Sequence, residues 1–257
     1  MVPRWALGAR FECAATLELQ SPRRGTEALI CAFDRRRVKN DCLRITIASS
    51  PPSLDAMPHR SDVQITCFQG QAIEPWLQEV AGLRIRVFRD FPYLYDGDID
   101  YEARYLRTYT EAADSVLVLA RDGDHVIGAS TGLPLRDEEP AFRRPFEQRG
   151  MDVDRVFYCG ESVLLPEYRG LGLGHRFFDA REAHARALGG MEWTGFAAVD
   201  RADDDPRRPA DYRSNEAFWQ MRGYQRQPGM TMTLAWKEVG CNEETEKPLT
   251  FWLRRLQ

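Results

Sequence analysis

The segment LLPEYRGLGLGHRFF, residues 164–178, joins a predicted buried strand to a predicted helix. The strand is the apolar run at residues 156–165, and the helix extends from about Gly174 to Leu188. The glycines between them allow positive φ angles and the close approach of a ligand to the backbone. Because free amides at a helix N-terminus attract anions, this turn predicts a diphosphate site, to which Arg169 adds a charge-assisted contact.

Two common nucleotide-binding motifs do not fit this turn. The dinucleotide motif G-x-G-x-x-G needs a glycine where this chain has His175 or Phe177, depending on the register. The mononucleotide motif G-x-x-x-x-G-K-[ST] is absent as well. The pattern that remains is R-x-x-G-x-G, formed by Arg169, Gly172 and Gly174 directly after a strand.

This pattern resembles the pyrophosphate-binding signature Q/R-x-x-G-x-G/A of the GNAT superfamily of acyl-CoA N-acyltransferases. The sequence PEYRG at residues 166–170 is also typical of that superfamily, and so is the later element FWQMRGY at residues 218–224. The resemblance extends from about Asp62 to Trp236, because the order of predicted elements fits too. It implies an α/β fold with a GNAT-type mixed, mostly antiparallel central sheet flanked by helices.

The resemblance also implies acetyl-CoA as the acyl donor, without a metal, and indicates which residues would hold it. In GNAT enzymes the strand before the signature separates from its neighbour and pairs with the pantetheine arm, a role that falls here to Ser162, Val163 and Leu164. A backbone amide of this strand would polarise the thioester carbonyl and stabilise the oxyanion. The pyrophosphate would be held by Arg169 and by the amides of Gly170, Leu171, Gly172, Leu173, Gly174 and His175.

Only a few residues are candidates for acid–base catalysis. Glu161 lies in the apolar strand and could take a proton from the attacking amine, directly or through water; alternatively, it is a strand carboxylate paired with an arginine. GNAT proteins often place a tyrosine, the acid that reprotonates the thiolate, where this chain has Trp219. Tyr212 or Tyr158 could take that role, or solvent could suffice; ordinary core packing is the alternative for both tyrosines.

Periodic patterns predict the other elements between residues 62 and 236. Strands are expected at 63–67, 193–199 and 230–236, and in a hairpin whose strands, 115–120 and 126–130, flank Asp122-Gly123. Helical spacing predicts helices over 73–87, near 101–109, and over 142–148 and 215–222. The aromatic residues at 91–95, with Tyr101 and Tyr105, either line the acceptor pocket, as the resemblance implies, or belong to the core.

Composition and charge exclude several other classes of function. Of the 257 residues, 43% are hydrophobic, which is enough for a core. The net charge is −4, and residues 61–257 carry 33 acidic and 25 basic side chains, which argues against nucleic-acid binding. The six cysteines and four histidines are scattered, so no metal site is predicted. No apolar run could span a membrane and the N-terminus lacks a secretory signal, so we expect a soluble, cytoplasmic protein.

The regular pattern begins at about Asp62, which divides the chain into two parts. Residues 1–61 are expected to form a poorly ordered extension. Alternatively, the start of translation is assigned too far upstream, and the true first residue is Met57. Residues 62–257 are expected to form the GNAT domain with a C-terminal tail. The apolar segment 248–253 of this tail is expected to dock on its own domain or across a homodimer.

The resemblance therefore implies an N-acetyltransferase. It would transfer an acetyl group from acetyl-CoA to a primary amine of a small molecule or peptide by direct attack in a ternary complex. Two alternatives stay open: a non-catalytic acyl-CoA-binding sensor or scaffold, which the missing tyrosine favours, and transfer of a longer acyl group. The acceptor is not identified by the sequence, because pocket residues come from variable loops.

Overall fold

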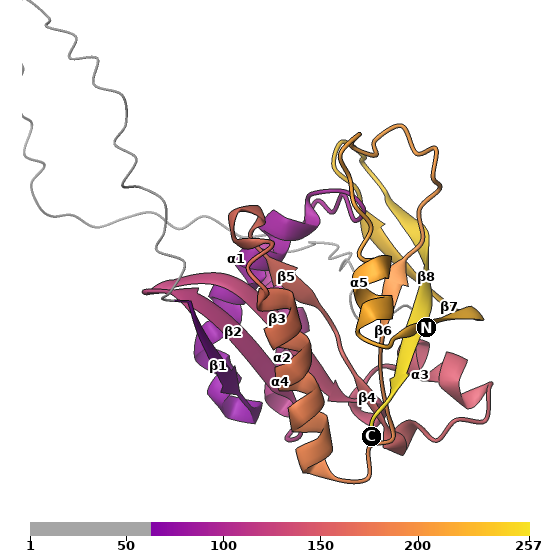
Figure 1. The fold of residues 1–257 in the computed structure, drawn as a ribbon. Helices are drawn as coiled ribbons and strands as arrows, with labels where there is room; N and C mark the ends of the chain where they lie inside the picture. The colour runs from indigo at the N-terminus through magenta and orange to yellow at the C-terminus, as the bar shows by residue number, and fades with distance from the viewer. Residues whose placement is uncertain (1–62) are drawn as a thin grey trace, which may run out of the picture. The chain divides into compact units, whose positions relative to one another are not determined.

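A computed structural model describes residues 63–257 of the chain (Figure 1). The predicted extension at residues 1–61 and the alternative start at Met57 lie outside the described residues. Within them, one mixed sheet has the strand order β1-β2-β3-β4-β6-β8-β7, and β5 pairs with β3 beside this path.

Antiparallel strands form the first half of the sheet. They are β1 (Gln64–Phe68), β2 (Val116–Asp122) and β3 (His125–Pro134). The β2–β3 hairpin confirms the turn predicted at Asp122-Gly123, since Asp122 pairs with His125. The short strand β5 (Ser162–Leu164) is antiparallel to β3 as well.

The second half of the sheet contains its parallel pair. Its strands are β4 (Val156–Tyr158), β6 (Trp193–Val199), β7 (Gln225–Lys237) and β8 (Glu244–Arg255). β4 and β6 are parallel, whereas the β3–β4, β6–β8 and β7–β8 pairs are antiparallel. The predicted sheet, mixed and mostly antiparallel, is thus confirmed.

The segment predicted as a C-terminal tail differs in the structure, because residues 244–255 form β8 between β6 and β7 of the same chain. Pro248 explains the difference: a proline has no N–H to donate, which argues against a central strand. It is tolerated here because β6 ends at Val199, opposite Leu249, so that no residue of β6 pairs with Pro248. Of the two docking alternatives, the segment 248–253 takes the first and pairs within its own domain.

Helices cover both faces of the sheet (Figure 1). The longer ones are α1 (Leu77–Phe88), α2 (Ile99–Glu111), α3 (Pro140–Glu147) and α4 (Leu173–Leu188), and α5 (Glu216–Met221) is short. The 3-10 helix η2 (Gly70–Trp76) contains Pro75 and forms the first part of the helix predicted over residues 73–87, and α1 continues from it. Asp98 caps α2, since its side chain accepts a hydrogen bond from the Tyr101 amide at 2.9 Å.

Shorter 3-10 turns connect these elements, namely η3 (Leu135–Asp137), η4 (Val153–Arg155) and η5 (Pro166–Tyr168). No helix in residues 63–257 combines the length and the apolar character that a membrane crossing requires. In the same residues, His, Cys, Asp and Glu side chains form no group of three or more that could hold a metal ion.

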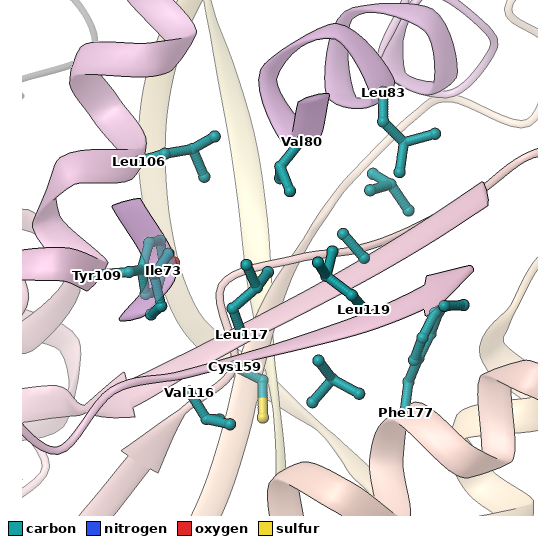
Figure 2. Packing of buried hydrophobic residues seen from close by; sticks show 14 of the residues in the cluster. Ile73, Val80, Leu83, Leu106, Tyr109, Val116, Leu117, Leu119, Cys159 and Phe177 are labelled. Carbon is teal, nitrogen blue, oxygen red and sulfur yellow. The ribbon is translucent and has the colours of Figure 1, made fainter. Parts of the chain in front are cut away.

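Figure 2 shows the main core between the sheet and its helices. Leu83 of α1 and Leu106 of α2 lie on one face of the sheet, and Phe177 of α4 lies on the other. Successive side chains of a strand point to opposite faces, so β2, with Val116 and Leu117 fully or almost fully buried, contributes to both layers. This explains why β2 is apolar at every position from Val116 to Ala120 instead of alternating.

Candidate active site

The sheet opens next to the glycine-rich turn, where the strand predicted over residues 156–165 is divided into β4 and β5. β4 pairs with β3 and β6, whereas β5, among the described residues, pairs with β3 alone. The break between them is held from two sides, because the Cys159 amide donates to Gly195 O of β6 at 2.8 Å and the Gly160 amide donates to Thr131 O of β3 at 3.2 Å. Within residues 63–257, one edge of β5 is therefore free of strand pairing.

Only glycine fits at the centre of this break. A Cβ atom on Gly160 would overlap Tyr109 Oη and would lie 2.8 Å from Thr131 Oγ1. The carbonyl oxygen of the next residue, Glu161, accepts hydrogen bonds from the Thr131 amide at 3.0 Å and from the Arg181 guanidinium at 3.2 Å. The backbone conformation of the break is thus fixed by contacts with β3, α2 and α4.

A cleft with a volume of about 1210 Å³ begins at this break. It runs past β5 and the start of α4 on one side and past the second half of β6 and α5 on the other. The residues predicted to hold acetyl-CoA that line the cleft are Ser162, Leu164, Arg169, Gly170, Gly172, Gly174 and His175. The side chains of Val163, Leu171 and Leu173 pack into the core instead, so these three could contribute backbone groups only.

The glycine-rich turn presents bare backbone to the cleft. α4 begins at Leu173, with Gly172 as its N-cap at a φ of +77°, a left-handed conformation that disfavours any residue with a Cβ atom. A Cβ atom at Gly170 or Gly172 would meet nothing within 4 Å. The first amides of the helix have no acceptor in a preceding turn, and the helix dipole makes them a site for anions. This open cradle fits a diphosphate.

Glu161 lines both this cleft and a second cavity, and it is 7% exposed. Its Oε2 atom pairs with Arg84 Nη1 at 2.5 Å, and Arg84 Nε donates to Glu102 Oε2. Burial alone would lower the pKa of Arg84, but the two carboxylates raise this pKa well above its usual value. The predicted pairing of Glu161 with an arginine is therefore present, while Glu161 Oε1 has no hydrogen-bond partner among the described residues.

The second cavity has a volume of about 110 Å³ and shares Phe88, Tyr93, Gly160, Glu161 and Ala197 with the cleft. We call it the aromatic cage, because its wall includes Phe88, Tyr93, Tyr95, Tyr101, Tyr105 and Trp236. Burial raises the pKa of each of these tyrosines, that of Tyr93 to about 12, so their hydroxyl groups are neutral. The Tyr93 carbonyl accepts a hydrogen bond from Trp236 Nε1 at 2.9 Å, which fixes this part of the wall.

The two tyrosines predicted as alternative acids lie in different cavities. Tyr158 lines the aromatic cage, and burial raises its pKa well above the usual value. Tyr212 lines the cleft, where its ring contacts that of Phe91 with the centroids 4.7 Å apart. Trp219 also lines the cleft and packs against Trp252, with 5.2 Å between ring centroids. Of the two tyrosines, Tyr212 is the one that shares the cleft with the residues predicted to hold acetyl-CoA.

Sequence reasoning missed three charged residues of the site, Arg84, Glu102 and Arg181. All three are buried, and each lies on the inward face of a helix. In α4, for example, Arg181 follows Leu173 and Phe177 at four-residue spacing and lines the cleft. A charged residue within an apolar helical stripe is the signal that could have found them, because a buried charge needs a partner.

Comparison with known proteins agrees with this geometry. Residues 83–208 match the family model described as the acetyltransferase (GNAT) family, a segment that extends from α1 through the break and the glycine-rich turn to the loop after β6. No curated protein is similar enough in sequence to match. A candidate acetyltransferase from Acinetobacter baylyi ADP1 has a similar structure, with a TM-score of 0.50 and 14% identity over 76% of this chain and 94% of that chain.

Two further solved structures show a comparable likeness. An N-acetyltransferase from Staphylococcus aureus Mu50 has a TM-score of 0.49 and 14% identity over 77% of this chain and 100% of its own. A candidate acetyltransferase from Salmonella typhimurium, solved with acetyl-CoA, has a TM-score of 0.49 and 12% identity over 76% of this chain and 95% of its own. At these identities the likeness concerns the fold alone. From the family match over residues 83–208, and from the sheet, break and turn described above, we conclude that this part of the chain belongs to an acetyltransferase domain of the GNAT family.

Proposed function

We propose that this domain transfers an acetyl group from acetyl-CoA to a primary amine of a small molecule or peptide by direct attack in a ternary complex. The observation that supports this most is that Gly160 and Glu161 line both the cleft and the aromatic cage. A donor in the cleft and an acceptor in the cage would meet at the break in the sheet. Such an arrangement accelerates transfer by orienting the two reactants and needs no covalent enzyme intermediate.

Several features of the cleft support the binding of acetyl-CoA there. The free edge of β5, from Ser162 to Leu164, would pair with the pantetheine arm. The amides from Gly170 to His175 would hold the pyrophosphate, and Arg169 would add a charged contact. When bound, acetyl-CoA supplies a thioester carbonyl as the electrophile. A backbone amide near the break would stabilise the negative charge that develops on the carbonyl oxygen.

Glu161 would act as the general base. Arg84 holds its Oε2 atom, while its Oε1 atom is buried without a partner among the described residues, so the carboxylate is oriented and still has one oxygen to accept a proton. The acceptor's ammonium loses one proton to Glu161, directly or through water. The nitrogen then forms the amide bond as the C–S bond breaks. The nitrogen gives its second proton to water. The leaving sulfur gains a proton either from Tyr212, which solvent then reprotonates, or directly from water.

Two measurements on the full chain test this function. Calorimetric titration with acetyl-CoA should give saturable binding, and a panel of primary amines should accelerate the release of CoA thiol above the rate with water. Absence of saturable binding would contradict the donor site. Binding without amine-dependent release from any member of the panel would contradict the transfer step.

One observation favours a second candidate, a non-catalytic acyl-CoA-binding sensor or scaffold: Trp219 stands where GNAT proteins often have a tyrosine. Both candidates predict stabilisation by acetyl-CoA, so binding alone does not separate them. Saturable binding with no thiol release over the whole panel would support the sensor. Parallel titrations with succinyl-CoA and longer acyl-CoA compounds would show whether the cleft prefers a longer acyl group.

A further inference from the structure

The charges of the side chains that line the aromatic cage do not cancel. Arg84 carries one positive formal charge, whereas Glu102 and Glu161, which both pair with it, carry two negative ones. All three residues are buried, with Glu102 1% exposed and Glu161 7% exposed. In a buried site, an uncompensated negative charge favours a bound cation and opposes a bound anion.

The cage wall also has no spare cation for an acidic ligand. Arg84 is the one basic residue among the described residues that line the cage, and besides its two carboxylates it lies over the ring of Tyr105, 4.6 Å from the centroid. Arg201, which contacts the wall from outside, donates to the Tyr93 carbonyl at 3.1 Å and pairs with Glu238 at 2.5 Å. A carboxylate in the cage would therefore meet the unpartnered Glu161 Oε1 without a counter-charge.

The remaining wall suits a short hydrocarbon body. Aromatic rings pack against alkyl and aryl groups, and their faces attract an ammonium ion. The cage, at about 110 Å³, is somewhat smaller than an apolar cavity of about 150 Å³ that takes up one benzene molecule. A body of a few carbon atoms would fill it.

We propose that the acceptor is a compact alkylamine or arylalkylamine that carries no carboxylate next to its amine. Its ammonium binds at Glu161 Oε1, on the rim shared with the cleft, and its hydrocarbon body packs against the rings of the cage. This inference rests on the proposed function and narrows the acceptor. It excludes free α-amino acids, because their carboxylate would be buried beside a negative charge for which the described residues that line the cage supply no further cation.

Matched acceptor pairs test this inference with the full chain and saturating acetyl-CoA. Isobutylamine is compared with valine, isoamylamine with leucine, and phenethylamine with phenylalanine, so that each pair differs only in the carboxylate. We expect kcat/KM, measured by thiol release, to be at least about 100-fold higher for the amine in the pairs that react. An amino acid that reacts as well as its matched amine would overturn the inference.

Leucinamide separates the effect of charge from that of size. It keeps the ammonium group and replaces the carboxylate of leucine by a neutral group of nearly the same size. We expect its kcat/KM to lie much closer to that of isoamylamine than to that of leucine. If leucinamide is as poor an acceptor as leucine, size limits the cage and the argument from charge is wrong.

Glu102→Gln tests the charge of the cage from the protein side. The variant leaves Arg84 and Glu161 as a neutral pair, so the preference for isoamylamine over leucine should fall at least about tenfold, while the affinity for CoA stays unchanged. A purely structural defect would lower kcat/KM for isoamylamine and for leucine by the same factor, so the ratio of the two values would not change. An unchanged ratio would therefore contradict the proposed role of the charge.

Failure of this inference can be distinguished from failure of the proposed function. If acetyl-CoA binds but neither amines nor amino acids cause the release of CoA thiol, the proposed transferase function is wrong, and so is the proposed acceptor class. If amino acids react as well as amines, the function stands and the acceptor class alone is wrong.

Discussion

The cleft and the aromatic cage meet at Gly160 and Glu161 but are built from different parts of the chain. The proposed donor site in the cleft is one continuous segment, residues 162–175, and it consists mainly of backbone groups. The cage is formed mainly by side chains from α1, α2, the segment between them and β7, with single residues from α3, β4, β6 and β8, around a buried ion cluster. Backbone sites depend on local conformation, whereas the cage depends on charged side chains that pair between different elements. Changes on one side should therefore leave the other side intact.

The largest effect is expected for Arg84→Met, on the cage side. The variant leaves the carboxylates of Glu102 and Glu161 buried without their shared partner. Breaking such a cluster by removing one member should lower the free energy of unfolding by about 3–5 kcal/mol. Urea denaturation measures this loss, and calorimetry should show that the folded fraction still binds CoA.

Arg86→Met is the matched control on the same helix. Arg86 forms an exposed pair with Glu167 at 3.4 Å, with both side chains at least half exposed. Exposed pairs contribute between about 0 and 1 kcal/mol, so the unfolding free energy should barely change. Arg84→Lys retains a positive charge and should recover part of the loss. Equal stabilities of Arg84→Met and Arg86→Met would show that the buried cluster does not stabilise the cage.

Glu161→Gln should reduce turnover at the meeting point of the two cavities. Loss of a general base lowers kcat by about 100-fold or more, while the CoA affinity should stay nearly unchanged, because the donor site does not use this carboxylate. Steady-state thiol release and calorimetry on the same preparation measure both quantities. Wild-type turnover would remove Glu161 from the mechanism, and a parallel loss of CoA affinity would show that the break itself has changed.

The same contrast explains how much of the molecule the sequence predicts. The strands and helices from residue 63 to 236 follow from local periodicity, and the glycine-rich turn follows from one short motif. The break at residues 159–161 does not, because it depends on contacts of Gly160 with Tyr109 and Thr131, which come from other elements. The strand β8 was not predicted because Pro248 argues against a strand. This proline is acceptable because β6 ends opposite Leu249, and the sequence does not indicate that β6 and β8 pair in this way.

The aromatic cage was only partly predictable. Tyr101 and Tyr105 stand out through their helical spacing, and the resemblance suggests where they lie. The pairing of Arg84 with both Glu102 and Glu161 joins three elements that are far apart in the sequence, so no local pattern specifies it. Charge balance in a buried cluster is a property of the assembled fold.

A smaller effect is expected for Glu138→Gln, a change beside the cage but outside its wall. Burial raises the pKa of Glu138 from 4.5 to about 8, so between these values the folded protein binds one more proton than the unfolded chain. The wild-type free energy of unfolding should therefore fall as the pH rises through this window. Glutamine cannot ionise, so between about pH 4.5 and pH 8 the variant should gain up to about 1.4 kcal/mol per pH unit relative to wild type.

Urea denaturation at several pH values checks this difference, and turnover provides its functional control. Because Glu138 is mostly protonated at neutral pH and lines neither cavity, kcat of Glu138→Gln should match that of wild type there, in contrast to Glu161→Gln. Parallel stability curves for the variant and wild type over the whole pH range would show that Glu138 ionises normally in the folded protein.

The last change, Gly172→Leu, affects the cleft and not the cage. It places a side chain on the turn that we propose holds the pyrophosphate, in a backbone conformation with a φ of +77°. Gly150→Leu is the matched control, because Gly150 has a φ of +69°, equally open surroundings and a position outside the cleft. Both variants should lose about 1–2 kcal/mol of unfolding free energy through left-handed strain.

The two glycine variants should differ only in their affinity for CoA. Loss of one hydrogen bond to a charged group corresponds to at least about a tenfold weaker Kd, which is expected for Gly172→Leu and not for Gly150→Leu. The cage should be unaffected, so the preference for isoamylamine over leucine at saturating acetyl-CoA should equal that of wild type. An unaltered Kd in Gly172→Leu would disprove the turn as the donor site, whereas a changed acceptor preference would show that cleft and cage are coupled through the break at Gly160.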